Sequence, residues 1–186
     1  PGFPAPGEVI VAVGATGVCG TDVHIYEWTR GYDIMTKAMP VTVGHEFAGT
    51  VTAVGAGVQG LREGARVAVR PSVVCSHCAN CRAGNSDHCT QRKGIGVTRD
   101  GGLASYVRVP AENCVAVPQS MAIEIAALAE PMTVCAEAVD NAAIKPGDRV
   151  LILGPGTIGQ GAALFARAAG AEVVLVGKDD APRLGR

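Results

Sequence analysis

Short segments in which apolar residues alternate with small or polar ones dominate the first half of the chain. This period of two, interrupted by Gly, Pro or Asn, is typical of half-buried β-strands. We therefore expect strands at residues 8–14, 47–54, 66–69 and 104–109. Short, irregularly spaced strands joined by glycine turns predict a small barrel or sandwich.

From residue 120 the pattern changes to stretches rich in Ala, Glu and Met with few turn residues. These stretches predict helices at 121–129 and 132–142, with Pro131 at the start of the second helix, where its missing N–H costs nothing.

The last fifty residues predict a β-α-β unit. The continuous apolar runs at 149–153 and 173–176 are typical of buried parallel strands. Between them, residues 157–169 predict an Ala-rich helix that ends at Gly170. We place the boundary between two domains at residue 135, within the helical stretch, so that the second domain covers 136–186.

Composition narrows the class of protein. With 48% hydrophobic and 18% charged residues, the chain has enough apolar material for a core and too little charge for disorder. The formal net charge of −1 and the few aromatic residues argue against a nucleic-acid partner. No apolar run approaches the ~18 residues of a membrane span, so no membrane partner is expected.

Four of the seven cysteines lie close together, at Cys75, Cys78, Cys81 and Cys89. In a chain with no recognisable secretory signal, such a cluster indicates metal before disulfides, and we expect a cytoplasmic protein. Four thiolates make a closed tetrahedral zinc site, which holds a loop and does no chemistry. The spacing differs from that of compact iron–sulfur motifs. Unliganded thiols or a transient redox set are the alternatives.

Cys19, His45, Glu46 and Glu130 form a second, dispersed group of metal-ligating residue types. Cys19, His45 and Glu46 lie in glycine-containing segments between expected strands, which suits a catalytic zinc site assembled by the fold. Taken singly, Cys19 is more often a packed thiol and His45 a core or surface histidine, and Glu46 can be a solvated charge.

A glycine motif, G-x-G-x-x-G, follows the apolar run at 149–153 and opens the helix expected at 157–169. Its position between strand and helix indicates a loop that binds the pyrophosphate of a dinucleotide, although a plain turn is the alternative. Lys178 stands near the end of the next strand, where an acid would bind the ribose of NAD, so NADP and NAD both remain open. The loop residues are Gly154, Pro155, Gly156, Thr157, Ile158 and Gly159.

Together these motifs resemble the zinc-dependent medium-chain alcohol dehydrogenase family, especially its polyol (sorbitol) and L-threonine 3-dehydrogenase branches. The resemblance covers nearly the whole chain but stops short of a complete nucleotide-binding domain. It implies an α/β fold with a β-rich part: a GroES-like β-barrel catalytic domain at 1–135, then the start of a Rossmann doubly wound domain at 136–186. The motifs are GVCGTDVHIYEW (17–28), VGHEFAGTV (43–51), CSHCANCRAGNSDHC (75–89), GGLASYVRVP (101–110), AEPMTVC (129–135) and LGPGTIG (153–159).

The resemblance also implies roles for single residues. Cys19 and His45 match catalytic zinc ligands, and Glu46 ligates or backs the metal. Glu130 stands where classical family members have Cys and the polyol branch has Glu. The four clustered cysteines match the structural zinc site.

Three residues of the 17–28 motif match positions that act around the metal. Asp22 resembles a carboxylate that orients the ligand histidine, Thr21 the hydroxyl that takes the substrate proton, and His24 a relay histidine. Family members are usually homodimers or homotetramers.

The expected function is hydride transfer between a small secondary alcohol, such as a polyol or L-threonine-like molecule, and NAD or NADP, with one catalytic and one structural zinc. Two alternatives remain at this point. One is a related reductase that lacks the catalytic zinc, and the other is a non-enzymatic module stabilised by zinc.

Overall fold

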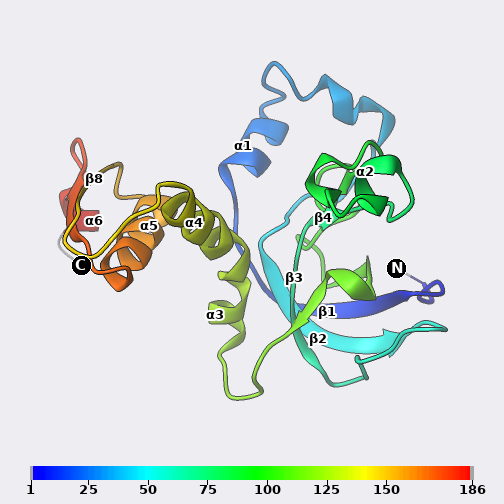
Figure 1. The fold of residues 1–186 in the computed structure, drawn as a ribbon. Helices are drawn as coiled ribbons and strands as arrows, with labels where there is room; N and C mark the ends of the chain where they lie inside the picture. Colours follow the sequence, from blue (N-terminus) through cyan, green and yellow to red (C-terminus); the bar gives the residue numbers. More distant parts are fainter. Residues whose placement is uncertain (1, 185–186) are drawn as a thin grey trace. The chain divides into compact units, whose positions relative to one another are not determined.

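The computed structural model describes residues 2–184, and the chain divides into two compact units, Pro1–Glu130 and Pro131–Arg186. A curled antiparallel sheet forms the framework of the first unit (Figure 1). Its strand order is β6-β1-β2-β3-β7. The strands are β1 (Glu8–Thr16), β2 (Phe47–Val54), β3 (Arg66–Val69), β6 (Tyr106–Pro110) and β7 (Cys114–Ala116).

The two faces of this sheet are covered by side chains of different size. On one face, Val9 and Val11 of β1 pack with Phe47 and Val51 of β2 in a fully buried cluster. On the other face, alanines of β2 and β3 contact alanines of α3 (Ile123–Ala127). Small side chains let the helix approach the strands closely, so α3 packs directly against this face of the sheet.

The remaining elements of the first unit lie in its connections. Helix α1 (Gly20–Tyr26) and a 3₁₀ turn (Asp33–Lys37) stand between β1 and β2. The paired strands β4 (Ser72–Val73) and β5 (Lys93–Gly94) flank a lobe that carries α2 (Ala79–Arg82) and a second 3₁₀ turn (Ser86–His88). A third 3₁₀ turn (Ala111–Asn113) joins β6 to β7.

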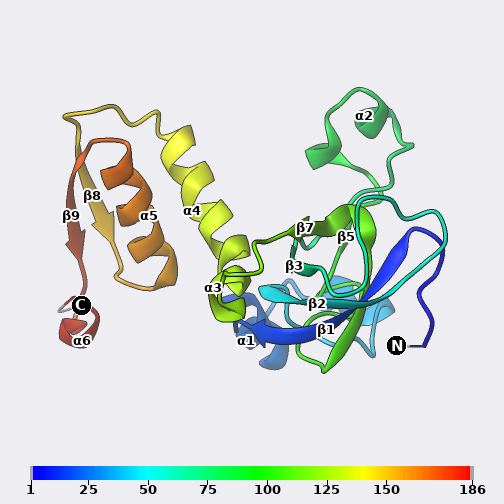
Figure 2. The same ribbon diagram turned by 90° about the horizontal axis from the view of Figure 1, so that it is seen from below.

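The second unit is a β-α-β arrangement. Strands β8 (Arg149–Leu153) and β9 (Glu172–Val176) pair in parallel, and α5 (Thr157–Ala168) runs beside them (Figure 2). Helix α4 (Ala129–Asn141), whose first two residues belong to the first unit, precedes them, and α6 (Ala181–Leu184) follows.

The expectation that both parallel strands are buried is wrong for one face of this pair. Leu151, Leu153, Val174 and Val176 are all more than two-fifths exposed. A parallel sheet normally has helices on both faces, and among the described residues no element covers this one. The apolar runs therefore predicted the strands correctly but not their burial.

Most predicted elements are present with modest changes in length. The strands at 47–54 and 66–69 have the expected bounds, whereas the last strand of the barrel begins at Tyr106. The helix expected at 121–129 shortens to Ile123–Ala127, and α4 begins at Ala129, which places Pro131 in its first turn. Helix α1 was not predicted.

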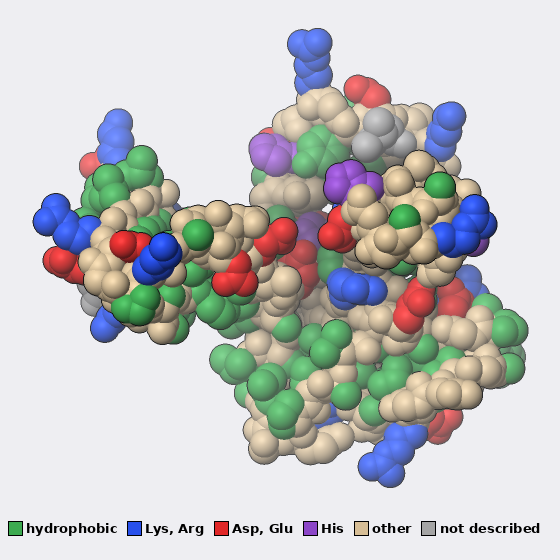
Figure 3. All heavy atoms as spheres, viewed as in Figure 1, with side chains coloured by type: hydrophobic (Ala, Val, Ile, Leu, Met, Phe, Trp, Pro, Cys, Tyr) green, Lys and Arg blue, Asp and Glu red, His purple; other side chains and the backbone are tan. Residues whose placement is uncertain are grey.

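Surface properties agree with the balanced composition. On the face drawn in Figure 3, acidic and basic side chains are interspersed. Within residues 2–184, no helix has the length and apolar character needed to cross a membrane.

Candidate functional site

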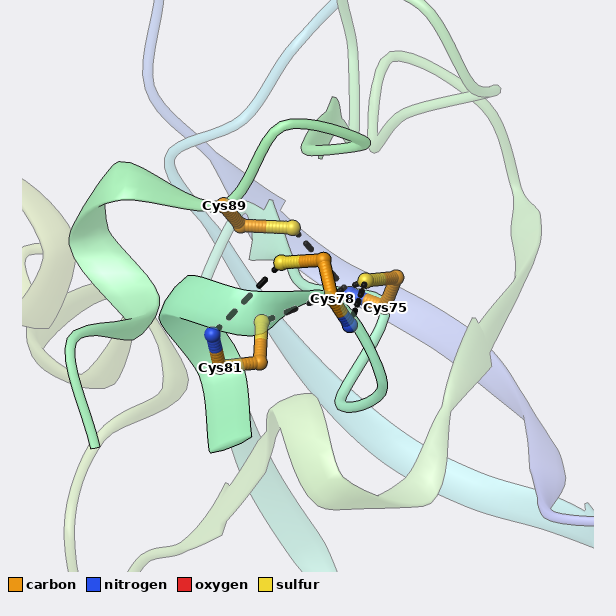
Figure 4. Close-up of side chains that lie close together, drawn as sticks. All are labelled: Cys75, Cys78, Cys81 and Cys89. Carbon is orange, nitrogen blue, oxygen red and sulfur yellow. Dashed lines mark hydrogen bonds between the residues drawn. The ribbon is translucent and has the colours of Figure 1, made fainter. Parts of the chain in front are cut away.

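The four clustered cysteines converge in the lobe between β4 and β5. Their sulfurs point toward one another (Figure 4) and all lie within 4.8 Å of one another. Cys78 begins α2, and Cys81 lies within that helix, so a single helical turn presents two of the sulfurs. Cys75 and Cys89 come from the two ends of the loop.

Backbone amides already polarise this site. The N–H of Cys78 donates to the sulfur of Cys75 at 3.3 Å, and the N–H of Cys75 donates to the sulfur of Cys89 at 3.4 Å. Backbone N–H groups of Cys81 and Thr90 lower the pKa of Cys78 to about 5. Desolvation and the neighbouring thiols raise the pKa of Cys81 to about 12.

Four sulfurs this close cannot all carry negative charge without a cation among them. The donor set fits a metal that accepts four thiolates in tetrahedral geometry, which is the preference of zinc.

The dispersed group is brought together by the pairing of β1 with β2. The register places Thr16, the last residue of β1, opposite Phe47, the first residue of β2. The N–H of Gly17 then donates to the carbonyl oxygen of Glu46 at 2.7 Å. The segments just beyond these strand ends therefore lie side by side. One carries Cys19 and the other carries His45.

One ligand atom from each of Cys19, His45 and Glu46 lies within 4.8 Å of the others. His45 is buried, and its Nδ1 has no hydrogen-bond partner within the described part of the chain. A thiol, an imidazole and a carboxylate at this spacing fit a zinc site with three protein ligands.

Asp22 ties the two ligand segments to each other. One carboxylate oxygen accepts the N–H of Cys19 at 2.9 Å, and the other accepts the N–H of Gly44 at 3.0 Å. The second oxygen also lies 3.8 Å from Nδ1 of His45. Asp22 is 5% exposed, so these interactions are shielded from water.

The other predicted site residues of this unit are not among these three clustered ligands. Glu130 is not one of the three clustered ligands. Burial raises the pKa of its carboxyl, the charge of His45 opposes that rise, and the charge of Glu46 adds to it. Thr21 is half-buried in α1, and His24, on the same helix, is exposed and stacks against Tyr32 at a ring distance of 6.2 Å.

The loop predicted to bind phosphate connects β8 to α5. Gly154 adopts a left-handed conformation, with φ of 99°, that favours glycine. A side chain at Gly159 would overlap the carbonyl oxygen of Gly154, whereas the space around Gly156 is open. Because Gly156 precedes the first residue of α5, an anion can approach the helix N-terminus there. Lys178 is exposed beyond β9.

Two cysteines stand apart from both metal sites. Burial raises the pKa of Cys114 to about 12, and burial also raises the pKa of Cys135. Both thiols are therefore expected to stay protonated and to act as packed apolar groups.

The segment at 96–103 contacts the residues just before His45, and no residue in it was predicted to belong to the site. Its three glycines at 96, 101 and 102 were the available indication of a close backbone approach.

Comparison with known proteins identifies the first unit. Residues 5–119 match the family model of the alcohol dehydrogenase GroES-like domain. The chain belongs to this family. The predicted resemblance and the predicted fold class are therefore confirmed.

Two of the relatives that match this chain are named as dehydrogenases. The chain is 37% identical to L-galactonate-5-dehydrogenase of Escherichia coli (strain K12), over 97% of this chain and 52% of that protein. It is 39% identical to an L-threonine 3-dehydrogenase of Mesorhizobium japonicum, over 92% of this chain and 49% of that protein.

A solved structure gives the same picture. It is that of a protein from Sinorhizobium meliloti 1021, assigned as a zinc-binding dehydrogenase and bound to NADP. It matches with a TM-score of 0.86 and 37% identity, over 97% of this chain and 51% of that one. The chain thus spans about half the length of the relatives it matches.

Proposed function

We propose that this protein is a zinc-dependent oxidoreductase that transfers a hydride between a small secondary alcohol and a nicotinamide dinucleotide. The observation that carries the proposal is the approach of Cys19, His45 and Glu46 to within 4.8 Å. Such a set of three protein ligands leaves a position for a substrate, as catalytic zinc sites do.

The three residues would hold zinc, and a water or the Glu130 carboxylate would complete the ligand set. When bound, zinc supplies a Lewis acid that lowers the pKa of a substrate hydroxyl, and the nicotinamide accepts a hydride. Asp22 keeps both ligand segments in place through their backbone amides. The second metal site, at the four cysteines, would hold a structural zinc.

Thr21 and His24 would move the proton that the alcohol loses. Thr21 follows Cys19 by two residues and is half-buried, so its hydroxyl can take a proton close to the ligand set. His24 is exposed one turn further along α1, where an imidazole can pass the proton to water. The order of burial along this helix supports a path from the site to solvent.

We assign the second domain, at 136–186, to the start of the dinucleotide-binding domain. The open space at Gly156 allows a pyrophosphate to meet the N-terminus of α5. The exposed ammonium of Lys178 beyond β9 favours the 2′-phosphate of NADP. The NADP-bound relative from Sinorhizobium supports this assignment.

The names of two relatives indicate a substrate class for this proposal. L-Galactonate and L-threonine, the substrates named for two of them, are both small polar acids with a secondary hydroxyl. We therefore place the substrate among polyols, sugar acids and hydroxy amino acids. We also propose a cytoplasmic location, because a cluster of four cysteines that binds metal, and forms no disulfides, is typical of a reducing compartment.

A substrate panel tests the proposal. Purified zinc-loaded protein is assayed with polyols, sugar acids, L-threonine and simple secondary alcohols, each with NAD and with NADP, by nicotinamide absorbance. We expect turnover of at least one polar secondary alcohol that stops when zinc is removed and returns when zinc is restored. Turnover that survives complete loss of zinc, or a second site that binds no metal, would contradict the proposal.

A further inference from the structure

The segment at 96–103 is hydrogen-bonded to the backbone immediately before His45. The N–H groups of Gly101, Gly102 and Leu103 donate to the carbonyl oxygens of Thr42, Gly44 and Val43, at 2.8, 2.8 and 3.0 Å. In return, the N–H of Thr42 donates to the carboxylate of Asp100 at 2.9 Å. Four hydrogen bonds therefore hold three consecutive residues, and the next residue in the chain is the candidate ligand.

Glycine is required for this contact. A Cβ at Gly101 would overlap the carbonyl oxygen of Gly44, and a Cβ at Gly102 would overlap the buried ring of Phe47. Gly44 itself has φ of 95°, and a Cβ there would lie 2.8 Å from the backbone nitrogen of Leu103. The two backbones are thus as close as they can be without side chains.

The hydrogen bonds from the segment at 96–103 and those to Asp22 converge on one residue, Gly44. The N–H of Gly44 goes to Asp22, whereas its carbonyl oxygen accepts from Gly102. Both polar groups of the residue before His45 are therefore fixed, one from the Cys19 side and one from the segment at 96–103. That segment is anchored in turn, because Ile95 is fully buried and Arg99 pairs with Glu8 at 2.7 Å.

We infer that the segment at 96–103 positions His45 for metal binding, with Asp100 and Gly101 as positioning residues outside the ligand set. The inference rests on the proposed function only in taking Cys19, His45 and Glu46 as the metal ligands. A rigid support of this kind lowers the cost of ordering the ligand when the metal binds.

Cobalt binding tests the inference. Cobalt(II) is titrated into protein whose four-cysteine site is already filled with zinc, and the dissociation constant and the d–d absorption spectrum are recorded. We expect Gly101→Ala to weaken cobalt binding by ~10–100-fold and to alter the spectrum. Gly170→Ala is the matched control, because Gly170 has a φ of 91° and a Cβ there would lie 3.0 Å from Pro146, in the second unit. It should lower the melting temperature but leave cobalt binding unchanged.

Asp100 gives a second, milder test that does not depend on Gly101→Ala folding. Asp100→Ala should weaken cobalt binding several-fold, and Asp100→Asn, which keeps an acceptor oxygen, should restore it to within about twofold. Wild-type affinity and spectrum in both Gly101→Ala and Asp100→Ala would overturn the inference while leaving the proposed function intact. Wild-type protein that binds no second metal would overturn both.

Discussion

The two candidate metal sites differ in how they are assembled. The four-cysteine site takes all its ligands from residues 75–89, in a lobe with its own short helix and turns. The site of Cys19, His45 and Glu46 takes its ligands from two segments that meet only because β1 pairs with β2. The first is a property of local sequence, and the second is a property of the sheet.

This difference has a physical consequence. A local site loses little chain entropy when it closes, and metal binding itself can stabilise the lobe. A site between strands must be held by the fold before the metal arrives, which explains why Asp22 accepts hydrogen bonds from the backbone N–H groups of both ligand segments. The local site should therefore contribute mainly to stability, and the other site mainly to chemistry.

The largest expected effect follows from removing the thiolate of the dispersed site. Cys19→Ala should lower turnover by ~10³-fold or more, because a Lewis acid contributes several kcal/mol to the transition state. The melting temperature and the metal at the four cysteines should be unchanged. Steady-state kinetics and elemental analysis check this, and full activity with one zinc per chain would refute the assignment.

The reverse effect is expected at the local site. Cys81→Ser should remove one zinc per chain. The melting temperature should fall by roughly 5–10 °C, because the folded protein loses about 2–3 kcal/mol of stabilisation by metal binding. Calorimetry and zinc analysis test this. Cys114→Ser, which changes a thiol outside both sites, should keep both metals. An unchanged zinc content in Cys81→Ser would show that the cluster is not a metal site.

Asp22 holds the two ligand segments without being a proposed metal ligand, so its removal tests the support alone. Asp22→Ala leaves the N–H groups of Cys19 and Gly44 without their acceptors, so the affinity of the dispersed site for zinc should fall by ~10–100-fold. The four-cysteine site should keep its affinity. The control is Asp148→Ala, which removes an exposed carboxylate in the second unit that accepts the N–H of Lys145. Equal zinc affinities in both variants would show that Asp22 does not hold the site.

The smallest effect concerns cofactor binding. The loop proposed to bind the cofactor's phosphates is local in sequence, as the four-cysteine site is. Lys178→Ala should raise the KM for NADP roughly two- to fivefold, since one exposed charge contact contributes about 0.5–1 kcal/mol. The KM for NAD should stay the same. Lys145→Ala, outside the loop, is the control. Equal changes in the KM for NADP and the KM for NAD would show that Lys178 does not determine the choice between the two cofactors.

The same contrast explains what the sequence could predict. The strands at 47–54 and 66–69 and the four-cysteine cluster follow from short-range patterns, and the structure has them as expected. The approach of Cys19 to His45 depends on the register that pairs Thr16 with Phe47, and spacing along the chain does not encode that register. The resemblance to a family indicated it instead.

Two features escaped the sequence analysis for other physical reasons. Helix α1 has no apolar period over its short length, and Asp22 stabilises its start through the N–H of Cys19. The segment at 96–103 has the composition of an ordinary turn. Its glycines are explained by Gly44 and Phe47, which lie against them in the structure. This second feature depends on contacts between segments that are distant along the chain.

Chelator-driven zinc release tests the two-site account most directly. Zinc-loaded protein is exposed to a strong chelator, and zinc release and circular dichroism are followed together. The account predicts two zinc ions per chain that leave in separate phases: a fast one from the three-ligand site without unfolding, and a slow one from the four cysteines with loss of structure. A single zinc per chain, or release of both in one phase, would contradict it.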